Sequence, residues 1–124
     1  MNHQRLARGE IWEIELGPRR GREQKGTRPC LVVSTDLMNR SAFPMAVVCP
    51  VTTRSRPAFG WRPGLQPCDL VVVDPTWIPR ANWVEIDQIL AVDLNERLTR
   101  HLATVVNADK LTAVDESLRM MLSL

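Results

Sequence analysis

The apolar residues of this 124-residue chain follow a period of two over most of its length and change to helical spacing only near the carboxyl end. Trp12, Ile14 and Leu16 alternate with acidic residues, and the apolar runs over 30–34 and 45–51 have the length of buried strands. Alternation of this kind places one face of a strand in a core. The pattern therefore predicts a strand-rich fold.

The second half of the chain contains three more candidate strands. Residues 70–73, 83–92 and 101–106 are predicted to be extended, and a single helical turn is expected over 95–98. Before them, residues 54–67 are rich in Pro and Gly. That segment is predicted to form a long connection or a loose hairpin.

One proline bears on the order of the strands. Pro50 lies within the 45–51 run and has no amide hydrogen to donate to a neighbouring strand. Prolines in sheets are found at edges or bulges. We therefore expect this strand to lie at a sheet edge or to carry a bulge just before Val51.

Helical spacing begins after Asn107, a favourable N-cap residue. Apolar residues then recur at three- and four-residue steps, at Leu111, Val114, Leu118, Met121 and Leu122. Asp115 and Arg119 are one turn apart on the other face, where we expect an ion pair, and the Met120-Met121 pair is interpreted as core filler. This stretch is predicted to be an amphipathic helix packed on the sheet.

The composition is that of a soluble globular protein. The apolar fraction of 44% and the charged fraction of 24% exclude disordered, collagen-like and membrane classes. No apolar run approaches the ~20 residues of a membrane span, and residues 1–5 lack the apolar core of a signal peptide. We therefore expect a single mainly β (α+β) domain over residues 1–124, located in the cytoplasm.

Charge is distributed unevenly along the chain. Residues 1–63 contain eleven Lys and Arg against five Asp and Glu, whereas residues 64–124 contain five against nine. A basic half favours a polyanionic partner, and the alternative is a solvated basic surface. The cations also cluster along the sequence, at Arg19, Arg20, Arg22, Lys25 and Arg28 and again at Arg54, Arg56 and Arg62.

Several kinds of chemistry are disfavoured by the residues present. The glycines of the 21–29 segment lead into a strand, without the Lys-Ser/Thr of a nucleotide-binding loop. Close acidic pairs and serine-type triads have no candidate near the basic segment, so metal-assisted hydrolysis is not expected. The cysteines Cys30, Cys49 and Cys68 are interpreted as reduced thiols, two of them inside apolar runs.

An arginine and a hydroxyl remain as candidate catalytic groups. Arg28 stands where the 30–34 strand begins, and the 45–51 strand delivers Thr52 to its carboxyl end, so the two converge if the strands pair. An RNA 2′-hydroxyl supplies its own nucleophile, and a guanidinium fork matches the phosphate oxygens. The alternatives are a salt bridge from Arg28 to Glu10 or Glu23, and a turn hydroxyl at Thr52 bonded to its own backbone.

Motifs in the same order cover nearly the whole chain and resemble those of the MazF/PemK (Kid) family of bacterial toxins. The matching residues are Arg8-Gly9-Glu10-Ile11-Trp12, Leu16-Gly17-Pro18, Gly21-x-Glu23-Gln24-x-Gly26-x-Arg28-Pro29-x-Leu31-Val32-Val33, Asn39-Arg40, Val51-Thr52 and Asp87-Gln88-Ile89. Leu90 departs from the family, whose members often have a basic residue there. The region 54–82 matches poorly, and the roles of Trp61 and Trp77 in base stacking, the core or a dimer interface stay open.

The resemblance implies an SH3-like, CcdB/PemK-type β-barrel of about five to seven strands, with a C-terminal α-helix and short helical turns. It implies a homodimeric endoribonuclease toxin that needs no metal or other cofactor. Such toxins cut single-stranded RNA at short sequences, leave a 2′,3′-cyclic phosphate and a 5′-hydroxyl, and are neutralised by an acidic, MazE-like antitoxin with a disordered tail.

By motif matching, the resemblance implies that Arg28 and Thr52 are catalytic. The expected RNA-binding residues are Arg19, Arg20, Arg22, Glu23, Gln24, Lys25, Gly26, Thr53, Arg54 and Gln88. Two other functions stay open: a gyrase poison like CcdB, which shares the fold but acts through a tryptophan-containing tail, and a non-catalytic nucleic-acid-binding module. This chain ends Met121-Leu122-Ser123-Leu124, without such a tail.

Overall fold

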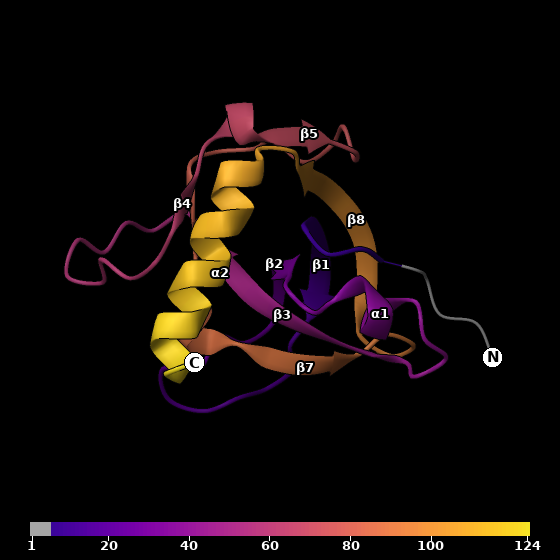
Figure 1. Cartoon of the computed structure of the whole chain (residues 1–124). Helices are drawn as coiled ribbons and strands as arrows, with labels where there is room; N and C mark the ends of the chain where they lie inside the picture. The colour runs from indigo at the N-terminus through magenta and orange to yellow at the C-terminus, as the bar shows by residue number, and fades with distance from the viewer. Residues whose placement is uncertain (1–5) are drawn as a thin grey trace.

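The structure is a computed structural model that describes residues 6–124, in which a curled antiparallel sheet is covered by one long helix (Figure 1). Its strands are β1 Glu10–Glu15, β2 Thr27–Val32, β3 Met45–Thr52, β4 Gly64–Leu65, β5 Leu70–Val72, β6 Asn82–Val84, β7 Leu90–Asp93 and β8 Leu98–Val105. Its helices are α1 Asp36–Asn39 and α2 Ala108–Leu122, with 3₁₀ turns at Pro67–Asp69 and Ile86–Gln88.

The strand order is β4-β6-β3-β2-β1-β8-β5, and β7 also pairs with β3. The predicted mainly β fold with a C-terminal helix is confirmed. The described part of the chain contains eight strands, however, rather than five to seven. The long strand β3 pairs with β2 on one side and with both β6 and β7 on the other.

The single strand predicted over 83–92 is wrong. The segment forms two strands, β6 and β7, separated by the 3₁₀ turn at Ile86–Gln88. Strand β7 pairs with the first half of β3 and β6 pairs with its last two residues. The 3₁₀ turn lets the chain pass from the last residues of β3 to its first half. A single straight strand over 83–92 could not pair with both parts, because the sheet curls between them.

The strand that contains Pro50 is predicted to lie at a sheet edge or to carry a bulge just before Val51, and the structure excludes the edge position. Strand β3 has neighbours on both sides, and Pro50 is paired with Cys30 of β2. Its carbonyl accepts a hydrogen bond from the amide of Glu85 at 2.8 Å, between the segments that pair with β6 and β7. The N and O atoms of one residue point to the same side of a strand. The nitrogen of Pro50 therefore points to the space between β6 and β7. At that point β3 has no paired strand, so the missing N–H costs no hydrogen bond of the sheet.

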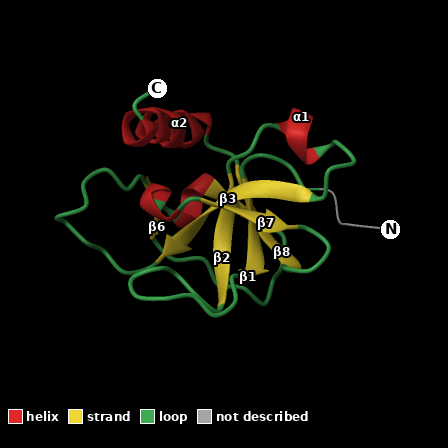
Figure 2. Cartoon of the chain, turned by 90° about the horizontal axis from the view of Figure 1, so that it is seen from below, coloured by secondary structure: helices red, strands yellow, loops and turns green. Residues whose placement is uncertain are grey.

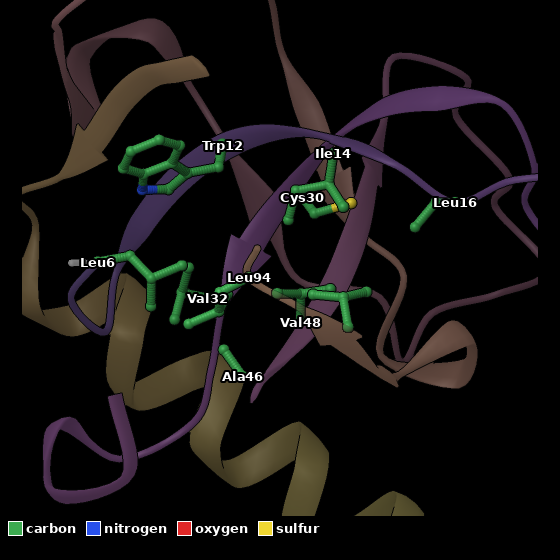
Figure 3. Close-up of a cluster of buried hydrophobic side chains, with 10 residues drawn as sticks. Leu6, Trp12, Ile14, Leu16, Cys30, Val32, Ala46, Val48 and Leu94 are labelled. Atoms are coloured by element: carbon green, nitrogen blue, oxygen red, sulfur yellow. The ribbon is translucent and has the colours of Figure 1, made fainter. Parts of the chain in front are cut away.

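The interior consists of two clusters of buried side chains. Figure 3 shows the first, in which Trp12 and Ile14 of β1 lie near Cys30 of β2 and Val48 of β3. The second lies under the long helix and includes Val114. Alternate residues of β1, β2 and β3 belong to the two clusters, so the clusters lie on opposite sides of the sheet.

Two cysteines belong to these clusters. Cys30 and Cys49 are buried free thiols, as expected, and Cys68 is exposed. Burial raises the pKa of Cys49 to about 12 and raises that of Cys30 as well. Both buried thiols are therefore protonated and unreactive at neutral pH.

Helix α2 lies across one side of the sheet (Figure 2). As predicted, the Asn107 side chain caps it by accepting a hydrogen bond from the amide of Asp109 at 3.0 Å. The carboxylate of Asp115 pairs with Arg8 rather than with Arg119. None of the helices in residues 6–124 has the length and apolar character needed to cross a membrane.

One smaller expectation is wrong. Met120 is 62% exposed and Met121 37% exposed, so the pair is not core filler. The single helical turn expected over 95–98 is present slightly earlier, because the amide of Arg97 donates to Asp93 O at 3.1 Å around residues 94–96, and β8 begins at Leu98. Asp93 holds that turn by accepting hydrogen bonds from the amides of Asn95 and Glu96.

Candidate active site

Arg28 and Thr52 lie opposite each other across the β2–β3 pair. The antiparallel register joins Cys30 to Pro50, and continuing it by two residues places Arg28 opposite Thr52. Because side chains alternate along a strand, this step returns to the same face of the sheet. Both side chains line the same open groove. The convergence expected from the sequence is therefore present.

The groove consists of two adjoining hollows. The first has a volume of about 460 Å³ and is lined by Arg22, Gln24, Arg28, Thr52, Thr53, Arg54, Arg56, Phe59, Arg62, Glu85, Asp87 and Gln88. The second, of about 340 Å³, is lined by Gln24, Arg28, Pro29, Val51, Thr52, Thr53, Trp77, Ile78, Arg80 and Asn82. Arg28 and Thr52 belong to both hollows, so they stand where the hollows meet.

Arg28 is exposed and its guanidinium is available to a ligand. Its Nε donates to the carbonyl of Lys25 at 3.0 Å, which orients the side chain. Within residues 6–124 no carboxylate lies at ion-pair distance from it. The alternative salt bridges are not formed, because Glu23 pairs with Arg19 and Glu10 accepts from the Trp12 indole. Arg28 therefore makes no ion pair within residues 6–124, and it acts on the nearby Glu85 carboxylate only through its charge, which opposes the raised pKa of that group.

The Thr52 hydroxyl has a local role as well as a place in the groove. Its Oγ1 accepts a hydrogen bond from the amide of Arg54 at 3.1 Å. This is the turn geometry that the sequence alternative described. Because the oxygen acts here as an acceptor, its hydrogen remains free to donate to a ligand.

The β1–β2 loop, residues 16–26, is closed at its base by backbone hydrogen bonds. Leu16 N donates to Gly26 O at 2.8 Å, and Gly26 N donates to Gly17 O at 3.1 Å. Both glycines have positive φ values, of 74° and 75°. Residues with a Cβ are strained in that conformation. The closed base of the loop therefore depends on these two glycines, and the loop residues Arg22 and Gln24 line the same hollow as Arg28.

The predicted RNA-binding residues of this loop fall into two groups. Arg22 and Gln24 line the first hollow. Outside both hollows lie Arg19, Arg20, Glu23, Lys25 and Gly26. Within that outer group, Arg19 donates to Gln24 O and pairs with Glu23 at 3.1 Å, so both side chains brace the loop. Contact of the outer group with RNA stays a prediction.

Gln88 connects this loop to the floor of the groove. Its Oε1 accepts from the amide of Gln24 at 3.2 Å, and its Nε2 donates to the carbonyl of Arg22 at 3.0 Å. Thr53 and Arg54 also line the first hollow. The structure thus places Gln88 in the groove, where its amide also fixes the loop.

Sequence reasoning missed an ion-pair cluster in the first hollow. Arg62 makes two hydrogen bonds to Asp87, at 2.8 and 2.7 Å, and its Nη2 lies 3.2 Å from Glu85 Oε2. The bonds from Arg62 lower the pKa of Asp87, whereas burial raises the pKa of Glu85. In the sequence, Arg62 could be recognised as part of the second group of clustered cations. No sequence pattern indicated that Glu85 and Asp87 are its partners.

Phe59, which the sequence did not single out, and Arg56, one of the second group of clustered cations, line the first hollow from the β3–β4 loop, residues 53–63. The Phe59 ring stacks on Trp61 with centroids 4.9 Å apart, and the Arg62 guanidinium lies 4.8 Å from the Phe59 centroid. Trp61 also donates its indole N–H to Asp87 at 3.1 Å. Trp61 therefore braces the loop rather than presenting a free face to the groove.

Trp77 lies on the other side of Arg28 and Thr52. It lines the second hollow together with Ile78 and Arg80, and it also packs against the second core cluster. Ile78 is 78% exposed. This half of the groove therefore offers Trp77 and Ile78 beside the guanidinium of Arg80, whereas the first half contains more arginines and one aromatic ring, Phe59.

A curled β-sheet with a cationic groove, in which an unpaired arginine faces a hydroxyl, defines a class of small proteins suited to binding a phosphodiester backbone. A profile of the family described as PemK-like, MazF-like toxin of type II toxin-antitoxin system matches residues 7–122. The chain belongs to this family.

Named relatives agree with this assignment. The chain is 31% identical over 123 residues to Endoribonuclease MazF9 of Mycobacterium tuberculosis, covering 96% of this chain and 98% of that one. It is 35% identical over 106 residues to Endoribonuclease PemK of Escherichia coli, covering 82% and 74%. The crystal structure of MazF from Deinococcus radiodurans superposes with a TM-score of 0.77 at 26% identity, covering 98% and 99%.

Proposed function

We propose that this protein is an endoribonuclease toxin that cleaves single-stranded RNA and is neutralised by a cognate antitoxin. The observation that carries the proposal is Arg28 opposite Thr52 at the junction of the two hollows. The names of the relatives support the activity, and the family description supports the toxin role.

The chemistry needs only groups that RNA and the protein supply. The 2′-oxygen attacks the adjacent phosphorus, the bond from phosphorus to the 5′-oxygen breaks, and the proton lost at the first oxygen is balanced by one gained at the second. The products carry a 2′,3′-cyclic phosphate and a 5′-hydroxyl. Arg28 stabilises the negative charge of the phosphorane and Thr52 donates a hydrogen bond to a phosphate oxygen. No cofactor takes part.

The two hollows hold the RNA on either side of the scissile bond. Arg22, Arg54 and Arg56 of the first hollow contact phosphates. Trp77 of the second hollow stacks on a base, which requires an unpaired nucleotide.

The biological role follows from this activity. Cleavage of messenger or other cellular RNA in the cytoplasm stops translation and growth. The antitoxin is an acidic protein whose disordered tail occupies the cationic groove and excludes RNA. The toxin acts as a homodimer.

The test is incubation of the purified protein with a long RNA in the presence of EDTA, followed by mapping of the fragment ends. We expect cuts at a short recurring sequence, with cyclic phosphate and 5′-hydroxyl ends. Intact RNA would overturn the proposal. Binding without cleavage would favour a nucleic-acid-binding module, and DNA breaks that depend on gyrase would favour a gyrase poison.

A further inference from the structure

One buried carboxylate contacts both loops that flank the groove. Glu85 Oε1 accepts a hydrogen bond from Gln24 Nε2 of the β1–β2 loop at 2.8 Å. Its other oxygen, Oε2, lies 3.2 Å from Arg62 Nη2 of the β3–β4 loop. The Glu85 side chain is only 3% exposed and that of Arg62 only 7%. Each loop therefore holds a different oxygen of the same buried group.

The backbone of Glu85 is fixed to the strand that carries Thr52. Glu85 directly follows β6, in which Val84 pairs with Val51, and its amide donates to Pro50 O at 2.8 Å. The backbone of Glu85 is thus bonded to β3 two residues before Thr52, while Gln24 lies four residues before Arg28. A displacement of Glu85 changes the position of one loop relative to the other.

We propose that Glu85 is a positioning residue that couples the β1–β2 and β3–β4 loops and so sets the geometry of Arg28 and Thr52 around the scissile phosphate. The expected effect on the cleavage rate rests on the proposed function. The expected effect on the two loops does not depend on any substrate. Buried charges are retained where they are paired and hydrogen-bonded. Here the pairing partners are the two loops themselves.

The charge of Glu85 matters to this role. Burial raises its pKa, and the groups that oppose the shift are the Gln24 amide, Arg62 and Arg28, whereas Asp87 adds to it. A neutral amide at this position keeps one oxygen that accepts from Arg62 or from Gln24, but it loses the charge that attracts the Arg62 guanidinium. Glu85→Gln therefore preserves the size of the side chain and weakens the link between the loops.

The experiment compares wild type, Glu85→Gln and Glu13→Gln by hydrogen–deuterium exchange and by single-turnover cleavage. Glu13 is a matched control, because its carboxylate is partly buried and pairs with Arg100 at 3.2 Å but does not line the groove. RNA affinity is measured with an oligonucleotide that carries a 2′-deoxy substitution at the cleavage position.

We expect Glu85→Gln to increase amide exchange in both loops and to lower the single-turnover rate by about tenfold to a hundredfold, with affinity changed less than about twofold. Glu13→Gln should match wild type in all three measurements. Unchanged exchange, exchange raised in one loop only, or a loss confined to affinity would overturn the proposal. If wild type leaves RNA intact, the proposed function fails, while the exchange data still decide the coupling.

A second variant, Arg62→Ala, tests the coupling independently in case Glu85→Gln does not fold. Arg62→Ala changes the β3–β4 loop directly and makes no contact with the β1–β2 loop among the contacts of residues 6–124. If Glu85 transmits the change, exchange should rise in the β1–β2 loop as well. An increase confined to the β3–β4 loop would overturn the proposal.

Discussion

Arg28 of β2 and Thr52 of β3 face each other across an antiparallel strand pair, with an arginine-rich hollow on one side and a hollow lined by Trp77, Ile78 and Arg80 on the other. The guanidinium makes no close ion pair within residues 6–124, and the hydroxyl retains its hydrogen for donation. Both groups are therefore free to bind a phosphate held between the two strands.

Replacing Arg28 with alanine should lower the cleavage rate by about a hundredfold or more, because one preorganised charge donor is lost. The fold should be retained, since the side chain is exposed and its hydrogen bond within the described residues is to Lys25 O. Cleavage kinetics and thermal unfolding check the two parts. Arg28→Lys keeps the charge without the planar guanidinium, so its cleavage rate should lie between those of wild type and Arg28→Ala. A near-normal rate for Arg28→Ala would exclude Arg28 from catalysis.

Thr52→Val removes the hydroxyl but keeps the branched shape. We expect a decrease in rate of about a hundredfold, as for loss of one hydrogen-bond donor to a developing oxyanion. Thr52→Ser restores the hydroxyl and is the matched control. Equal rates for valine and serine would show that the hydroxyl serves only the turn to Arg54.

Arg22 lines the first hollow, whereas Arg19 is paired with Glu23 outside it. Neutralising Arg22 should reduce the slope of log affinity against log salt by roughly 0.7, the contribution of one single-strand phosphate contact. Neutralising Arg19 should change the slope less. Binding titrations over a range of salt concentrations measure both, and an unchanged slope for Arg22→Ala would place the RNA elsewhere.

Trp77→Ala should weaken RNA binding by about 1–3 kcal/mol, the range for loss of one stacked base. The matched control is Trp61→Phe, because Trp61 stacks on Phe59 and makes a bond to Asp87 rather than facing the groove. Fluorescence anisotropy with a short RNA measures the affinities. If Trp77→Ala binds like wild type, the second hollow does not hold a base.

Glu85 and Asp87 should contribute to stability over opposite pH ranges. Arg62 lowers the folded-state pKa of Asp87, so its contribution is present above the unfolded pKa and is lost as pH falls through the folded value. Burial raises the folded-state pKa of Glu85, so its contribution is present below the unfolded pKa and is lost as pH rises through the folded value.

Urea unfolding between about pH 3 and 8 tests this difference. Asp87→Asn should remove part of the loss of stability on the acid side of the ordinary Asp range. Glu85→Gln should remove part of the decline on the alkaline side of the ordinary Glu range. The same pH dependence in both variants would contradict the assignment of the two shifts.

Local sequence determined the elements whose pattern is self-contained. The alternation around Trp12 and Ile14 predicts β1, and the spacing after Asn107 predicts α2 together with its cap. The position of Arg28 at the start of one strand and of Thr52 at the end of another also follows from the chain itself. These features depend on residues close together in sequence, where periodicity and capping act directly.

Only the tertiary structure decided which distant groups meet. Strand β3 is interior despite Pro50, and Glu85 reaches Gln24 and Arg62, residues 61 and 23 positions away along the chain. No local pattern encodes such a pairing, because the curl of the sheet and the break between β6 and β7 set it. The chain thus carried its catalytic candidates in its sequence, and the folded sheet supplied the buried ion pairs that surround them.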